Sequence, residues 1–158
     1  MIIRTAKLQD AEKLAAIAIC VWIDTYAVNG AEEKVSRYAM TNFTATVFAK
    51  TINEKLVLVC ESDNGLLGYT VIDKPQQNKV EIETLYVLPK FQGQGIGRSF
   101  IDKVVELYKY NIWLSVWIEN QKALRFYKHL GFVEDGELFF DLYGEKIRNI
   151  VLKRENDF

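Results

Sequence analysis

A glycine-rich turn in the second half of the chain is the segment whose residues most clearly indicate chemistry. An apolar run ends at Pro89, glycines stand at positions 93, 95 and 97, and a pattern typical of a helix covers 95–110. Such a turn leaves several main-chain N–H groups free at a helix N-terminus, where they suit the charge of a pyrophosphate. Glycine removes side chains that would hold the anion away, and Arg98 adds positive charge. The segment therefore predicts a site for a phosphate-bearing ligand.

The spacing of these glycines argues against two familiar nucleotide sites. The Gly-x-Gly-x-Gly pattern at 93–97 differs from the Gly-x-Gly-x-x-Gly pattern of dinucleotide-binding folds. It also lacks the Gly-Lys-Ser/Thr ending of a P-loop, so ATP would find neither the lysine nor the hydroxyl that binds magnesium. A nucleotide-binding protein is therefore disfavoured, and an ordinary tight turn is the alternative for the segment taken alone.

The rest of the chain predicts the elements that position this turn. Apolar and β-branched patterns predict strands over 2–5, 55–61, 66–72, 80–87, 113–117, 132–138 and 146–152. Helical periodicity and end signals predict helices over 10–26, 32–40, 95–110 and 120–130, while 42–53 is ambiguous and partly helical. This order predicts an α/β fold whose sheet is antiparallel in its first half and then contains a βαβ crossover. No linker or repeat interrupts 1–158, which is predicted to be a single domain.

Composition excludes several classes of protein and of site. The 158 residues carry a formal net charge of -1, with no basic run that would indicate nucleic acid. Cys20 and Cys60 lie in no metal-binding pattern and His129 is the single histidine, so no metal site is expected. We expect both thiols to be buried in a reducing cytoplasm. No signal peptide opens the chain and no apolar run approaches the about 20 residues of a membrane span, so a cytoplasmic protein is expected.

Two motifs resemble those of the GNAT superfamily of N-acyltransferases. Gln92-x-x-Gly95-x-Gly97, which follows Leu85-Tyr86-Val87-x-Pro89, is similar to the acyl-CoA signature of that family. Asn120-x-x-Ala123-x-x-Phe126-Tyr127-x-x-x-Gly131-Phe132 is similar to its second motif and stands at the expected distance. The order of elements matches the family from Ile3 to about Lys153. The resemblance implies an acyl-CoA N-acyltransferase domain with a GNAT-like mixed sheet and helices on both of its faces.

The resemblance also implies which residues bind acetyl-CoA, the acyl donor. The main-chain amides that would hold the CoA pyrophosphate are those of Gln92, Gly93, Gln94, Gly95, Ile96, Gly97 and Arg98. Main-chain groups of Leu85 and Val87, on either side of Tyr86, would pair with the pantetheine arm, between strands that separate towards Val87 and Val116. Asn120 would contact this arm. Asn120 and Tyr127 are about two helical turns apart, so they share a helix face.

Transfer to an amine needs a base and benefits from a proton donor, because an amine with a pKa near about 10 is protonated at neutral pH and a thiolate must leave. Tyr127 matches the usual acid position of the family. Glu81 and Glu83 share a strand face and are the candidate bases, with Glu81 ranked first. A bulge in this strand would change which acid faces the site. An ordinary solvated acidic pair is the alternative, and His129 is rejected because it stands just before a helix end.

The acceptor site is expected to involve Trp22 and Tyr26, one helical turn apart, although packing onto the sheet explains both equally well. Residues 21–29 faintly resemble bacterial polyamine acetyltransferases. We therefore expect a small-molecule primary amine, polyamine-like among others, that attacks acetyl-CoA directly in a ternary complex. The alternatives are a protein N-terminal or lysine acetyltransferase and a non-catalytic CoA-binding sensor module. No nucleic acid, metal or membrane is expected as a partner. A homodimer is expected.

Overall fold

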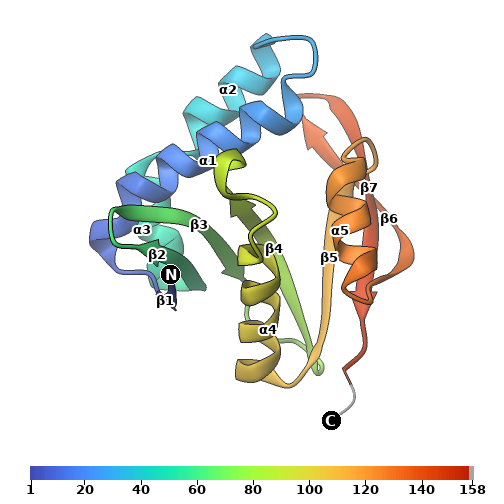
Figure 1. Cartoon of the computed structure of the whole chain (residues 1–158). Helices are drawn as coiled ribbons and strands as arrows, with labels where there is room; N and C mark the ends of the chain where they lie inside the picture. The colour runs from blue at the N-terminus through green and yellow to red at the C-terminus, as the bar shows by residue number, and fades with distance from the viewer. Residues whose placement is uncertain (157–158) are drawn as a thin grey trace.

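The computed structural model describes residues 1–156, which form one seven-stranded mixed sheet with helices on both faces (Figure 1). The strands are β1 (Ile2–Thr5), β2 (Leu56–Ser62), β3 (Gly65–Ile72), β4 (Lys79–Val87), β5 (Asn111–Trp117), β6 (Val133–Leu142) and β7 (Glu145–Arg154). The helices are α1 (Ala11–Tyr26), α2 (Glu33–Asn42), α3 (Ala45–Glu54), α4 (Ile96–Tyr108) and α5 (Gln121–His129), with short 3-10 turns η1 (Leu8–Asp10) and η2 (Pro89–Phe91). The strand order β1-β2-β3-β4-β5-β7-β6 places β7 between β5 and β6.

The predicted fold class is confirmed. Strands β1 to β4 pair antiparallel, and β4, α4 and β5 form the parallel crossover unit. Apolar residues of α4, such as Phe100 and Val104, pack with Val80 and Ile82 of β4 on one face of the sheet. Leu14 of α1 and other apolar residues of α1 and α3 pack with β2 and β3 on the other face. Burial of these two faces provides most of the driving force for folding.

One local expectation is made definite by the structure and another is wrong. Residues 42–53, expected to be partly helical, contain most of helix α3, which Thr44 caps by accepting a hydrogen bond from the Val47 amide at 3.2 Å. Its apolar residues fall on one face towards α1 and β2, a spacing that the polar positions between them obscure. Cys60 is buried as expected, but Cys20 is exposed on α1 because it lies on the face turned away from the sheet.

The feature that positions the site is the limited pairing of β4 with β5. The two strands pair at only three positions, which join 79–81 to 111–113. Beyond Glu81 and Trp113 both strands continue without pairing, and Figure 1 shows them diverging. We call the separation of their main chains beyond these residues the β4–β5 gap. It leaves one edge of each strand without a neighbouring strand, at the place where the glycine-rich turn follows β4.

Strand β4 is also irregular on its other side. Its register with β3 shifts between Val71 and Ile72, where Ile82 and Thr84 are the successive partners and Glu83 is the extra residue of a bulge. Further along, Gly68 of β3 lies so close to β4 that a Cβ at this position would stand 2.6 Å from the Tyr86 carbonyl oxygen. The strand therefore needs glycine at position 68 for close approach of two main chains.

Gly68→Ala should destabilise the fold by about 1–3 kcal/mol, because the added methyl group forces β3 away from β4. Gly65→Ala is the matched control in the same strand, since a Cβ there would meet no atom within 4 Å. Urea unfolding followed by circular dichroism measures both free energies. Equal midpoints for the two variants would show that the close approach at Gly68 is not a constraint on the sheet.

Candidate active site

The glycine-rich turn presents a row of free main-chain donors. Within residues 1–156, the amides of 93–98 donate no hydrogen bond to another protein group. Gly93 and Gly95 have φ angles of 78° and 84°, a conformation that favours glycine. The amides stand at the N-terminus of the thirteen-residue helix α4, whose dipole adds to their attraction for an anion. This arrangement fits the pyrophosphate site that the sequence predicts.

Two residues of this turn have structural roles that the motif did not reveal. A Cβ at Gly97 would stand 2.8 Å from the Phe126 ring, so this glycine allows α4 and α5 to approach each other. The Gln92 side chain donates to the Val87 carbonyl oxygen at 2.9 Å and accepts from the Lys122 ammonium at 2.5 Å. Its own amide already donates to the Pro89 carbonyl oxygen at 3.3 Å. Gln92 therefore joins the end of β4 to α5, and the free donors begin at 93.

Main-chain groups of β4 line one side of the β4–β5 gap. The Leu88 amide donates to the Leu67 carbonyl oxygen at 2.9 Å, and the Thr84 carbonyl oxygen accepts from Thr70, so both point towards β3. Groups of successive residues in a strand alternate between the two neighbours, so those of Leu85 and Val87 point into the gap. The Tyr86 side chain points out of the sheet towards the face covered by α1 and α3, and its ring packs edge-on against Tyr69 with ring centroids 5.7 Å apart.

Helix α5, which follows β5 at the end that does not pair with β4, carries Asn120 at its start and Tyr127 further along. Asn120 caps the helix, its side-chain oxygen accepting from the Ala123 amide at 3.2 Å. Tyr127 is buried, and its ring lies edge-on to Phe126 and Phe132 at centroid distances of 4.9 and 5.4 Å. Its hydroxyl has no hydrogen-bond partner among residues 1–156, and burial raises the pKa of the phenol above its usual value. Tyr127 is thus a neutral hydrogen-bond donor at physiological pH.

The candidate bases form part of a cluster of three carboxylates. Oxygen atoms of Asp73, Glu81 and Glu83 lie within 4.8 Å of one another, and the Lys55 ammonium pairs with Glu83. Desolvation raises the pKa of Glu81, and the negative charges of Glu83 and Asp73 raise it further, while Lys55 lowers it. Glu81 and Glu83 both face away from the α4 side, as expected, although the bulge leaves Glu83 out of register. Asp73 and Lys55 were not predicted, because they come from distant segments.

Aromatic residues cover the opposite end of the gap. Trp22 is buried, and its indole N–H donates to the Val35 carbonyl oxygen at 2.9 Å, which ties α1 to α2. Tyr26 stacks on Trp22 at 4.1 Å and on Trp117 of β5 at 4.9 Å. Burial raises the pKa of Tyr26 to about 12, with a smaller effect of Tyr38. Tyr26 is therefore partly buried between two indole rings, and Trp22 lies behind it in the core.

Two further residues near this end were missed by sequence reasoning. Trp117 follows the buried β5 run, and nothing local distinguishes it from a core aromatic residue. Asn149 of β7 is its direct neighbour in register and donates to the Ser115 hydroxyl at 3.3 Å. Its Oδ1 is the single fully buried side-chain oxygen or nitrogen without a partner in the described part of the chain. Leaving such an acceptor unpaired costs about 1–3 kcal/mol, so an N–H donor there would be stabilising.

His129, which is rejected as a base, and Arg98, which is predicted to add positive charge at the pyrophosphate site, both lie at the surface. His129 is exposed near the end of α5. Arg98 is exposed in the first turn of α4, with its guanidinium 3.8 Å from Asp102, and it lies beside the free amides.

Among residues 1–156, no helix combines the length and the apolar character that crossing a membrane requires.

Comparison with known proteins decides the family. A model of the acetyltransferase (GNAT) family matches residues 15–132, which include both motifs and the gap between β4 and β5. The chain belongs to the GNAT family. It is an acyl-CoA-dependent N-acetyltransferase with acetyl-CoA as the donor, and the free amides of 93–98 fit the diphosphate of that donor.

Individual relatives agree with this assignment. An uncharacterised N-acetyltransferase of Mycobacterium tuberculosis is 27% identical over 154 residues, which cover 94% of this chain and 99% of the relative. The spermine/spermidine N(1)-acetyltransferase of Bacillus subtilis is 35% identical over 81 residues, covering 48% of this chain and 52% of the relative. The PaiA N-acetyltransferase of Thermoplasma acidophilum, solved with coenzyme A, has the same fold, with a TM-score of 0.80 at 21% identity and 98% coverage of both chains.

Lys55→Met should raise the pKa of Glu81, because it removes the positive charge that holds this pKa down while Asp73 and Glu83 remain. The midpoint of the Glu81 carboxyl titration, followed by carbon-detected NMR, is then expected to move to higher pH. Lys50→Met on α3 removes the same charge away from the cluster and should leave the midpoint in place. A midpoint that does not move in Lys55→Met would contradict the electrostatic coupling.

Proposed function

We propose that the enzyme acetylates the primary amine of a small molecule by direct attack within a ternary complex. The observation that carries the proposal is the free amides of 93–98 at one end of the β4–β5 gap and Glu81 at its other end. Tyr127 lies on the helix that packs against the turn through Phe126 and Gly97. A CoA thioester held by its diphosphate at the turn would run along Leu85 and Val87 as an added strand. Its acyl group would then lie between the hydroxyl of Tyr127 and the carboxylate cluster.

The transfer uses these residues in one addition and one elimination. The neutral amine nitrogen attacks the thioester carbonyl carbon, a C–N bond forms, and the C–S bond then breaks. The proton lost by the amine passes to Glu81, directly or through water, and the raised pKa of Glu81 makes it a better proton acceptor than an ordinary exposed carboxylate. Tyr127 donates a hydrogen bond to the departing sulfur, which takes up a proton to leave as CoA thiol.

A cationic acceptor suits the charges at the inner end of the gap. Asp73, Glu81 and Glu83 carry three carboxylates against the one ammonium of Lys55. The partial similarity to the spermine/spermidine enzyme of Bacillus subtilis supports a polyamine-like amine as one candidate. A protein N-terminal or lysine acetyltransferase is the alternative. The homodimer stays a prediction, which the position of β6 at the edge of the sheet allows, because an edge strand can pair with a second chain.

The test is a free-thiol release assay with acetyl-CoA against polyamines, amino acids, aminoglycosides and short peptides. Turnover of a small amine, with peptides slower, is the expected result. Calorimetry with CoA, done on the same protein, distinguishes the enzyme from the non-catalytic CoA-binding sensor module. Binding of CoA without turnover of any amine would favour a sensor module over an enzyme of small amines, and turnover confined to peptides would favour the protein acetyltransferase.

Tyr127→Phe should lower kcat at least about tenfold while CoA affinity stays nearly unchanged, because the hydroxyl acts on the sulfur during transfer and the ring keeps its packing. Thiol release measures kcat, and calorimetry measures the affinity for CoA. The matched control is Tyr108→Phe, which removes a hydroxyl at the end of α4. Equal kcat values for Tyr127→Phe and the unsubstituted enzyme would remove Tyr127 from the chemical step.

A further inference from the structure

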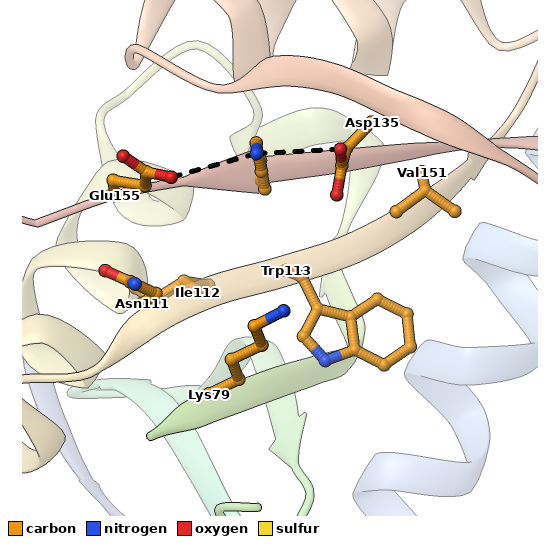
Figure 2. A pocket seen from close by; sticks show the side chains of 8 residues that line it. Lys79, Asn111, Ile112, Trp113, Asp135, Val151 and Glu155 are labelled. Carbon is orange, nitrogen blue, oxygen red and sulfur yellow. Dashed lines mark ion pairs between the residues drawn. The ribbon is translucent and has the colours of Figure 1, made fainter. Parts of the chain in front are cut away.

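A groove lies on the sheet face opposite α4, at the start of β4. It consists of two adjoining cavities of about 180 Å³ each, which share Lys79 and Trp113 as lining residues. One cavity extends to Asp73 and Glu81. The other, shown in Figure 2, extends to Asp135 and the neighbouring residues of β7. We call the two together the Trp113 groove. It begins at the candidate base and leads away from the aromatic stack of Tyr26.

The charges in the Trp113 groove differ in whether they are paired. The Lys153 ammonium lies 3.6 Å from Asp135 and 3.7 Å from Glu155, so its charge is balanced (Figure 2). Lys79 has no carboxylate within 4.0 Å among residues 1–156. Figure 2 shows its side chain extending from β4 towards β5, which carries Trp113. The unpaired ammonium of Lys79 is therefore free to bind an anionic group of a ligand.

The pattern of β4 places a cation and a carboxylate on the same side of the sheet. Lys79 and Glu81 are two residues apart, so their side chains leave one face of the strand from Cα atoms about 7 Å apart. Glu81 is opposite Trp113 in the last paired position before the β4–β5 gap opens. Lys79, Glu81 and Trp113 line the same cavity, so a ligand with an anionic group and an amine joined by a short stem can contact all three. The Trp113 indole would cover an apolar stem.

We propose that the acceptor is the side-chain amine of a basic amino acid, with its carboxylate paired to Lys79, its aliphatic stem on Trp113 and its amine at Glu81. This inference rests on the proposed function and narrows its substrate class. A linear polyamine of the same length would place an ammonium near Lys79 with no carboxylate to balance it, so two positive charges would repel. In a basic amino acid the α-carboxylate offsets the charge of the α-ammonium and pairs with Lys79. The groove therefore selects for a carboxylate as well as for an amine.

L-lysine and cadaverine test the proposal, because they have the same amine and stem and differ in the α-carboxylate. With the unsubstituted enzyme, kcat/KM for L-lysine should exceed that for cadaverine by about tenfold, the effect of a charge-assisted hydrogen bond. Lys79→Gln should bring the ratio close to one by lowering only the value for L-lysine. Lys79→Glu should reverse the preference. Lys50→Glu makes the same charge change on α3 and should leave the ratio unaltered.

Two results would overturn the inference. One is preference of the unsubstituted enzyme for cadaverine, and the other is an equal ratio in Lys79→Gln and the unsubstituted enzyme. Both would leave the acetyltransferase of small amines intact. If no amine is turned over, the proposed function fails, and calorimetry of L-lysine with the CoA complex then decides the inference separately. Heat of L-lysine binding that is present in the unsubstituted enzyme and disappears in Lys79→Gln would support binding in the Trp113 groove. No heat of binding in the unsubstituted enzyme, or equal heat in both proteins, would refute it.

Discussion

The site depends on the point at which main-chain pairing between β4 and β5 stops. Main-chain N–H and C=O groups need partners, and a strand edge without a neighbour is a ready place for an extended ligand. Here the edge of β4 beyond Glu81 has no partner strand, and helices pack near the end of the gap on both faces of the sheet. Tyr26 stacks on Trp117 on one face, and on the other Phe126 fills the space that Gly97 leaves. The extended, amide-containing arm of CoA can complete the sheet in this place.

Charge gives the gap a direction. At its outer end, the amides of 93–98 and the dipole of α4 form a positive region. At its inner end, Asp73, Glu81 and Glu83 form a negative one that Lys55 only partly balances. In the proposed function, a donor would therefore be drawn by its diphosphate to the outer end and an acceptor by its ammonium group to the inner end, so that their reactive atoms meet between the two ends. Such placement lowers the barrier before any proton moves.

Local patterns predicted the parts of this site that lie close together in the chain. Pro89, the glycines after it and Asn120 stand at element ends, where turn and cap chemistry leaves a strong signal. The partners across the sheet left no such signal. Glu81 and Trp113 meet through a parallel register, which depends on long-range packing, and Lys55 reaches Glu83 from the end of α3. The sequence allows a bulge in this strand but does not indicate its position, because only the pairing with β3 reveals Glu83 as the extra residue.

The burial of Tyr127 constrains what this residue can do. Its pKa lies above the usual value of about 10, whereas a thiol has a pKa near about 8.5, so complete transfer of the phenol proton to a thiolate is uphill. A hydrogen bond to the sulfur does not need that transfer. It stabilises negative charge as the C–S bond breaks, and it does so strongly because the ring lies in a poorly solvated site. The final proton on the thiol can then come from water or from the proton that Glu81 received. In the proposed mechanism Tyr127 would therefore lower the energy of the departing thiolate, and the apolar environment around Phe126 and Phe132 is compatible with that role.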